Sequence, residues 1–254
     1  MLTFDDAGHG PAVLLLHSSV ADRRMWRGQF DAIAADHRVI APDLPGHGES
    51  ALSPGPLSLA DELVGLLDAL DVDRATVVGS SFGGAVALRL AHAAPRRVAG
   101  LVLLCTAYEG VEPTEDVQEF GAEETRLLEA GDVRGAVELN VRTWLGPDAD
   151  DEARDLVRVM QRRAFEIQLA ADTLPDPPYL TDEAPDLAAL DLPVRIAYGR
   201  HDLDMFADIA AHLTAGISGA RSVELDWAAH LPALERPAQT AELLRRFIAE
   251  IERS

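Results

Sequence analysis

The chain has 254 residues, 48% of them hydrophobic and 26% charged, a composition typical of one or two folded domains and not of a disordered chain. It carries 22 basic and 43 acidic residues, and the resulting net charge of -21 argues against nucleic acid or an anionic membrane surface as a partner. Every basic residue is an arginine, which excludes the lysine chemistry of Walker A loops and of pyridoxal phosphate enzymes.

Short apolar runs along the chain predict a parallel sheet whose strands are buried on both faces. Segments with helical spacing of apolar residues separate most of these runs, and such alternation is typical of an open α/β sheet covered by helices. In chain order, the predicted strands span residues 12–16, 39–41, 75–78, 100–104, 194–198 and 223–225. The predicted helices span residues 25–35, 59–70, 82–94, 207–215 and 237–251.

The alternation is interrupted at residues 108–191, where we find no convincing strand. We therefore predict an α/β fold with a mostly parallel, doubly wound sheet. Residues 1–107 and 192–254 would form its core, and residues 108–191 a helical cap inserted between two strands. Within the cap, helices are expected at residues 123–130, 134–144 and 151–171.

The segment Gly79-Ser80-Ser81-Phe82-Gly83 matches the Gly-x-Ser-x-Gly pattern and lies between a predicted strand and a predicted helix. A nucleophile on such a turn sits in strained backbone, so the residues two before and two after it need to lack side chains. Gly79 and Gly83 meet this need, and the helix beyond Ser81 offers unpaired N–H groups to a developing negative charge. Ser81 is therefore the candidate nucleophile.

A serine nucleophile needs a histidine base and an acid that orients the histidine, both on loops after later strands. Asp202 follows the fifth predicted strand and His230 follows the sixth, which gives the order serine, acid, histidine. Asp204 and His201 share the loop of Asp202, and Glu109 follows an earlier strand, so Asp204 and Glu109 remain rival acids.

With these residues in place, the chain resembles the α/β-hydrolase superfamily over nearly its whole length. The landmarks occur in the family's order and comprise His17-Ser18-Ser19, Trp26, Asp43-Leu44-Pro45-Gly46-His47-Gly48-Glu49-Ser50, the turn at Ser81, residues 199–202 and residues 230–237. The resemblance implies an oxyanion hole formed by the N–H groups of Ser19 and Phe82, although His17-Ser18 stands where many relatives have His-Gly. It also implies a first strand that is short or missing. The cap is most similar to the 3-oxoadipate enol-lactonase and carbon–carbon hydrolase branches.

Four further residues are candidate contacts of a small-molecule substrate, namely Ser18, Trp144, Phe165 and Leu231. The two aromatic residues occupy helical positions of the predicted cap, where they would serve equally well as its core. Arginines that could bind an anionic substrate are Arg142, Arg162 and Arg163 in the cap and Arg200 beside the acid loop.

The sequence thus predicts a cofactor-free serine hydrolase that cleaves an ester-like or lactone bond through an acyl-enzyme. Carboxylic ester hydrolysis is favoured over hydrolysis of a carbon–carbon bond. A lyase or acyltransferase on the same fold, or a ligand receptor without turnover, remains an alternative. The single cysteine, Cys105, excludes an internal disulfide, and no metal-ligand motif occurs, so we expect no metal. Since no long apolar run or signal-peptide pattern occurs, we expect a cytoplasmic protein, whose oligomeric state the sequence does not indicate.

Overall fold

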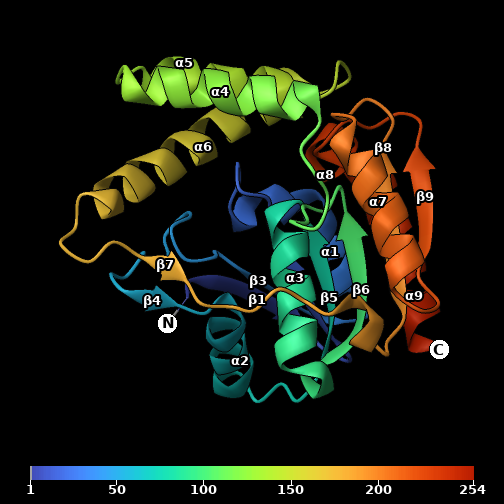
Figure 1. Cartoon of the computed structure of the whole chain (residues 1–254). Helices are drawn as coiled ribbons and strands as arrows, with labels where there is room; N and C mark the ends of the chain where they lie inside the picture. Colours follow the sequence, from blue (N-terminus) through green and yellow to red (C-terminus); the bar gives the residue numbers. More distant parts are fainter. Residues whose placement is uncertain (1) are drawn as a thin grey trace.

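The structure, a computed structural model, describes residues 2–254 of the chain. Within these residues a seven-stranded sheet has the order β1-β3-β2-β5-β6-β8-β9, and only β1 runs antiparallel to its neighbour (Figure 1). The strands are β1 (Phe4–Gly8), β2 (Ala12–Leu16), β3 (Arg38–Pro42), β5 (Ala75–Ser80), β6 (Val98–Leu104), β8 (Val194–Gly199) and β9 (Arg221–Leu225).

All six predicted strands are present, and β1 adds a seventh at the edge of the sheet. The expectation of a short or missing first strand is resolved in favour of a short one, because β1 has five residues. Its sequence, FDDAG, is largely exposed and carries two aspartates. An edge strand of this kind has no apolar run by which it could be recognised.

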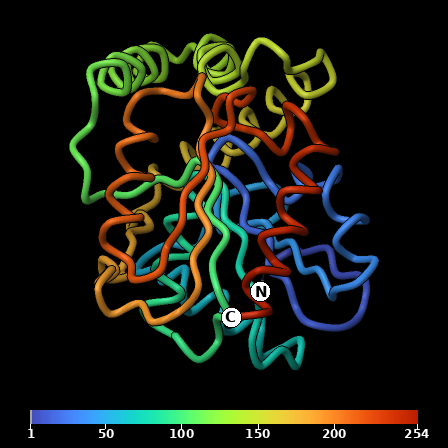
Figure 2. Tube along the Cα trace, turned by 90° about the vertical axis from the view of Figure 1, so that its right-hand side faces the viewer, coloured from blue at the N-terminus to red at the C-terminus, as the bar shows by residue number. Residues whose placement is uncertain are grey.

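Helices cover both faces of the sheet, which is why its inner strands are apolar without interruption. Every residue of β5 is buried, as are the last four residues of β2. The doubly wound arrangement predicted from the alternation is confirmed (Figures 1 and 2). One face carries α1 (Arg27–Ala34) and α9 (Pro237–Glu252), and the other carries α2 (Leu59–Ala69), α3 (Phe82–Ala93) and α7 (Met205–Gly216). Shorter helical turns are η1 (Arg23–Trp26), η2 (Pro95–Arg97), η3 (Leu187–Ala189) and α8 (Pro232–Glu235).

The helices of residues 115–172 form a layer over the carboxyl ends of the parallel strands, and residues 173–191 run back from this helical layer to the start of β8 at the opposite edge (Figure 1). One expectation for residues 108–191 is wrong, because they do contain a strand: β7 (Tyr179–Leu180) pairs in parallel with β4 (Pro56–Leu57). A two-residue strand is too short to produce a recognisable apolar pattern. The helices of the layer are α4 (Glu115–Glu129), α5 (Val133–Trp144) and α6 (Asp151–Asp172).

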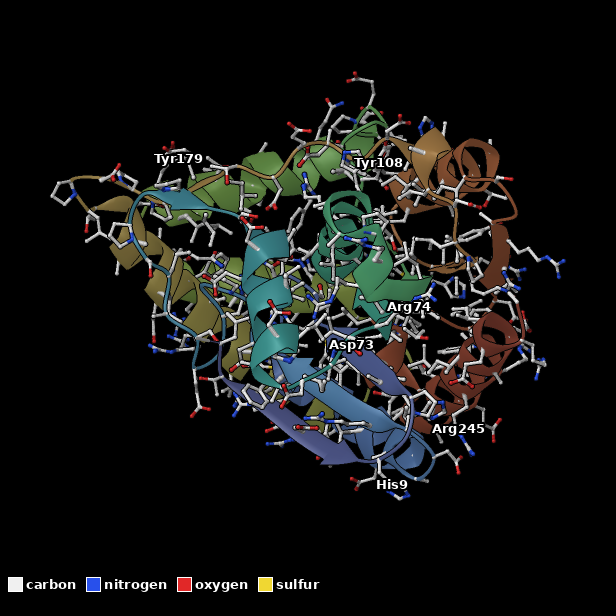
Figure 3. All side chains as sticks on the ribbon, turned by 90° about the horizontal axis from the view of Figure 1, so that it is seen from below. His9, Asp73, Arg74, Tyr108, Tyr179 and Arg245 are labelled. Carbon is white, nitrogen blue, oxygen red and sulfur yellow. The ribbon has the colours of Figure 1, made fainter. Side chains whose placement is uncertain are left out.

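The two edges of the sheet differ in what their loops carry. At the carboxyl edge, under the helical layer, Ser81 follows β5, Asp202 follows β8 and His230 follows β9. Figure 3 looks onto the opposite edge, where His9 and Asp73 lie in the turns that precede β2 and β5. No helix within residues 2–254 has both the length and the apolar character needed to cross a membrane.

Candidate active site

Ser81 occupies a strained turn between β5 and α3. Its φ is 52° and its ψ is -114°, a conformation that a residue with a side chain rarely adopts. Only glycine fits at positions 79 and 83, because a side chain there would collide with backbone. A Cβ atom on Gly79 would lie 2.4 Å from the carbonyl oxygen of Gly83, and a Cβ atom on Gly83 would lie 2.2 Å from the carbonyl oxygen of Leu16. The turn therefore packs backbone against backbone and holds the Ser81 side chain in one place.

Ser81, His230 and Asp202 form a continuous chain of hydrogen bonds. His230 Nε2 lies 2.8 Å from Ser81 Oγ, and His230 Nδ1 lies 2.7 Å from Asp202 Oδ2. Because a carboxylate can only accept, Nδ1 carries the proton and Nε2 is left to accept from the Ser81 hydroxyl. The other oxygen of Asp202 accepts from the Leu203 N–H at 2.8 Å, which fixes the carboxylate. Nearly all of the His230 and Asp202 side chains is buried.

The rival acids lie elsewhere. The Glu109 side chain is 77% exposed and accepts from Arg89 at 2.6 Å. Asp204 lies at the start of α7, and its backbone N–H donates to Asp116. The geometry thus brings together the three residues that the sequence singled out and leaves both rivals outside.

The backbone N–H groups of Ser19 and Phe82 donate to no other group within residues 2–254. Phe82 is the first residue of α3, where the helix itself provides no acceptor. Ser19 is exposed and lies in the loop after β2. Both groups are therefore unpaired within the described residues, as the oxyanion hole expected from the sequence requires, although Ser18 and not glycine precedes Ser19.

Two buried histidines brace the Ser19 loop. His17 Nε2 accepts from the Leu44 N–H at 2.9 Å, while Nδ1 donates to the Ser18 carbonyl at 2.8 Å. His47 Nε2 lies 3.1 Å from the Ser19 carbonyl oxygen, and the two rings stand 4.9 Å apart. Burial lowers the pKa of each ring to about 4, so both are neutral at pH 7. Neither ring is hydrogen-bonded to Ser81 or Asp202, and their hydrogen bonds support the loop.

Sequence reasoning assigned no role to Glu235, which holds the His230 loop from both sides. Its Oε2 accepts from the Ala229 N–H at 2.9 Å and its Oε1 from the Leu231 N–H at 3.0 Å. The residue is 6% exposed, and burial raises the pKa of its carboxyl although these two N–H groups act in the opposite direction. An acid in the otherwise apolar run after His230 was the available signal.

Of the four candidate substrate contacts, Trp144 is the one that lies against the hydrogen-bonded histidine. Its ring centre is 4.5 Å from that of His230, and its Nε1 donates to Asn140 at 2.8 Å. Phe206, from α7, packs on His230 at 4.3 Å and was not anticipated from the sequence. The other three candidates are buried beside the site or in the general core: Ser18 next to the Ser19 loop, Leu231 next to His230, and Phe165 in α6.

Cys105 lies close enough to Asp202 and His230 for the three side chains to offer ligand atoms within 4.8 Å of one another. Two features oppose a metal there. His230 Nδ1 already donates its proton to Asp202, and burial together with the Asp202 charge raises the pKa of the Cys105 thiol, which keeps the sulfur protonated. The cluster does not fit a metal centre.

A cavity of about 320 Å³ adjoins the turn from the side of Phe82 and His47. Most of its other lining residues are apolar, including Leu57 in β4 and Leu180 in β7, but Gln168 and Asp172 of α6 add polar groups. The lining is therefore mixed and could contact both apolar and polar parts of a ligand.

Comparisons with known proteins agree with this geometry. The family model for the alpha/beta hydrolase fold matches residues 11–237. The chain is 30% identical over 267 residues to the 2-hydroxymuconate semialdehyde hydrolase of Pseudomonas sp. (strain CF600). This alignment covers 97% of the present chain and 90% of that protein. The structure of the present chain is similar to that of a thermophilic esterase from Thermogutta terrifontis, with a TM-score of 0.81 and 28% identity over 98% of this chain and 93% of the other. It is also similar to Est816, described as an N-acyl homoserine lactone degrading enzyme, with a TM-score of 0.77 and 27% identity over 97% and 96% of the two chains.

Proposed function

Because the chain belongs to the α/β-hydrolase family, we propose that it is a serine hydrolase that cleaves an ester or lactone bond of a small organic substrate without a cofactor. The observation that carries the proposal is the hydrogen-bonded chain from Ser81 Oγ to His230 at 2.8 Å and from His230 to Asp202 at 2.7 Å. An esterase and a lactone-degrading enzyme among the similar structures support the choice of bond.

In the first half of the reaction, Ser81 Oγ attacks the substrate carbonyl while His230 Nε2 takes its proton. Asp202 holds the ring in the required tautomer and stabilises the imidazolium. The N–H groups of Ser19 and Phe82 donate to the tetrahedral oxyanion, and each such donor is worth on the order of 3 kcal/mol in the transition state. His230 then gives the proton to the leaving oxygen, which departs and leaves Ser81 acylated.

In the second half, water attacks the acyl group with His230 again as the base, and collapse of the second oxyanion returns the acid product and free Ser81. We propose that residues 108–191 act as a lid in both steps. Trp144 of this segment, together with Phe206 of α7, packs against the buried His230 ring, which limits the access of bulk water to the imidazolium.

The second candidate function is hydrolysis of a carbon–carbon bond, which the relationship to the 2-hydroxymuconate semialdehyde hydrolase supports. The same residues would act on a ketone carbonyl, with a stabilised carbanion and not an alkoxide as the leaving group. A panel of p-nitrophenyl esters, lactones and ring-cleavage diketones separates the two activities by their relative kcat/KM.

The proposal is tested by the variant Ser81→Ala together with labelling by a fluorophosphonate. We expect Ser81→Ala to abolish turnover and labelling, because only binding and oxyanion effects remain. Ser80→Ala is the matched control, since Ser80 is the adjacent, fully buried serine, and its hydroxyl has no hydrogen-bond partner within the described chain. A label mapped by mass spectrometry to any other serine, or full activity of Ser81→Ala, would overturn the assignment.

A further inference from the structure

A second cavity, of about 500 Å³, is lined by an unusual number of arginines for so acidic a chain. It lies between α6 and the loops at residues 22–24 and 48–49. Five of the chain's 22 arginines face it, together with three acids. In a protein with a net charge of -21, a cavity whose lining holds more cationic than anionic side chains is a distinctive feature.

Three of these arginines are neutralised by carboxylates. Arg24 donates to Asp22 at 2.6 Å and 2.8 Å, in a bidentate pair. Arg158 donates to Glu138 and to Asp155, each at 2.7 Å. The third, Arg23, pairs with the buried Asp43 and with Glu49. Because carboxylates of the protein neutralise these three guanidinium groups, the three arginines line the cavity but offer no unpaired positive charge to a ligand.

Arg162 and Arg163 differ from the other three. Arg162 has no carboxylate within 4.0 Å and no hydrogen bond within residues 2–254. Arg163 reaches Glu166 only at 3.8 Å, a contact between two half-exposed side chains that contributes little, and its Nε donates to the Gly48 carbonyl at 3.3 Å. Two guanidinium groups, which stay charged at any accessible pH, thus present free donors to the cavity.

The sequence of α6 places this charge on the cavity side. Positions 158, 162 and 166 repeat at helical spacing, and positions 159 and 163 lie beside them, so all five share one face. The intervening residues Met160, Ala164 and Phe165 are buried against the rest of the helical layer. The arginine face is therefore the face that α6 turns toward the core loops.

Those loops are continuous with the oxyanion loop. Residues 22–24 follow the turn that contains Ser19. Gly48 is the residue after His47, whose Nε2 atom lies 3.1 Å from the Ser19 carbonyl oxygen. A group held in the cavity would thus contact the segments that follow and brace the Ser19 loop. A substrate with its carbonyl at Ser81 and an anionic end in the cavity would span this loop.

We propose that Arg162 and Arg163 form a subsite for an oxyanion, a carboxylate or phosphate, that the substrate carries at a distance from the bond to be cleaved. The proposal rests on the proposed function, and it narrows the substrates to esters or lactones with a second, anionic end. Neither arginine takes part in the bond-breaking step, so their effect is on binding of the anionic end.

The kinetic test compares neutral and anionic substrates of matched length. Mono-p-nitrophenyl esters of succinate, adipate and suberate are assayed against p-nitrophenyl esters of the unsubstituted acids, with inorganic phosphate and an alkyl phosphate as inhibitors. We expect the double variant Arg162→Gln, Arg163→Gln to lower the ratio of anionic to neutral kcat/KM by about tenfold or more at the best chain length. Arg134→Gln is the control, because Arg134 is an exposed arginine of the neighbouring helix α5 that forms no ion pair.

The outcomes separate this proposal from the proposed function. A ratio that is the same in the double variant and the wild type, for every chain length, overturns the subsite. Should no ester be hydrolysed and Ser81 stay unlabelled, the proposed function fails, and the subsite is then judged by calorimetric binding of phosphate and succinate. Binding by the wild type that the double variant loses supports the subsite, and no binding at about 10 mM overturns it. With suberate added as a carboxylate inhibitor, stronger inhibition by the alkyl phosphate than by suberate favours phosphate as the anion of the subsite, and the reverse order favours carboxylate.

Discussion

Glu235 offers the sharpest test of how the structure supports His230. Its carboxylate is the acceptor for two backbone N–H groups, one on each side of the histidine, and it is 6% exposed. Glu235→Gln keeps one acceptor oxygen but turns an amide NH₂ toward the second N–H. Glu235→Ala removes both acceptors and leaves a small void beside the loop.

The expected magnitudes follow from the cost of an unpaired buried donor, which is about 1–3 kcal/mol. Glu235→Gln leaves one such donor, but it also relieves the burial of a charge, so we expect a loss of about 1–3 kcal/mol in the free energy of unfolding. Glu235→Ala leaves two donors and a cavity, and we expect about 3–5 kcal/mol. Both variants release the backbone that holds the ring 2.8 Å from Ser81 Oγ, so kcat should fall at least about tenfold with KM little changed.

Urea denaturation followed by circular dichroism measures the stability change, and hydrolysis of a neutral ester measures kcat. Glu242→Gln on α9 is the matched control, because Glu242 is exposed and its carboxylate has no ion pair within the described chain. Glu235 does not support the His230 loop if Glu235→Gln unfolds at the same urea concentration as the control and retains full kcat. A stability loss with unchanged kcat would show that the two hydrogen bonds support folding alone.

Three other predictions concern different parts of the site. Asp202→Asn should lower kcat by about 10⁴-fold, whereas Asp204→Asn should change it by less than about tenfold; a larger defect at Asp204 in the same assay would contradict the assignment of the acid. Burial lowers the pKa of His17 and His47 to about 4, below the unfolded value of 6.5, so the unfolded state takes up more protons as the pH falls. The free energy of unfolding should therefore fall by up to about 1.4 kcal/mol per pH unit for each histidine between about pH 6.5 and 4, and urea midpoints that stay flat over this range would be incompatible with neutral buried rings. Trp144→Ala, which removes the ring against His230, should change the ratio of kcat/KM for a longer acyl ester to that for an acetate by about tenfold, while an equal loss for both would mean that the ring only packs the cap.

The features that could be predicted from sequence are those set by local sterics or by long apolar runs. The turn at Ser81 is one, because Gly79 and Gly83 meet backbone only a few residues away or in the adjacent strand. The six apolar strands are another, since burial on both faces requires continuous hydrophobic sequence. β4 and β7 lack this property and were not predicted, because each has only two residues. β1, which the family resemblance implied as short or missing, is an exposed edge strand without an apolar run.

Asp202 and His230 could be placed because loops that follow parallel strands converge on one edge of the sheet. The choice of Asp202 over Asp204 depends on two residues of spacing within one loop, and only the coordinates show which carboxylate reaches the ring. Glu235 could not be assigned from pattern alone. Its role depends on the short helix α8 bending back so that a side chain five residues after His230 meets the N–H groups on either side of it.

The sequence alone could not decide which residues of the helical layer would contact a substrate. The sequence predicts a helix at residues 151–171, where the structure has α6 with one buried and one exposed face. It does not predict what the exposed face meets, because that depends on how the layer sits over loops more than 100 residues away in sequence. The contact of Arg163 with the Gly48 carbonyl, 115 residues apart, is such a case. The sequence offers Arg163 only as one of four arginines that could bind an anionic substrate. The placement of α6 makes it part of a cavity wall beside the segments that brace the Ser19 loop, and this placement supports the ligand-binding role proposed for its charge.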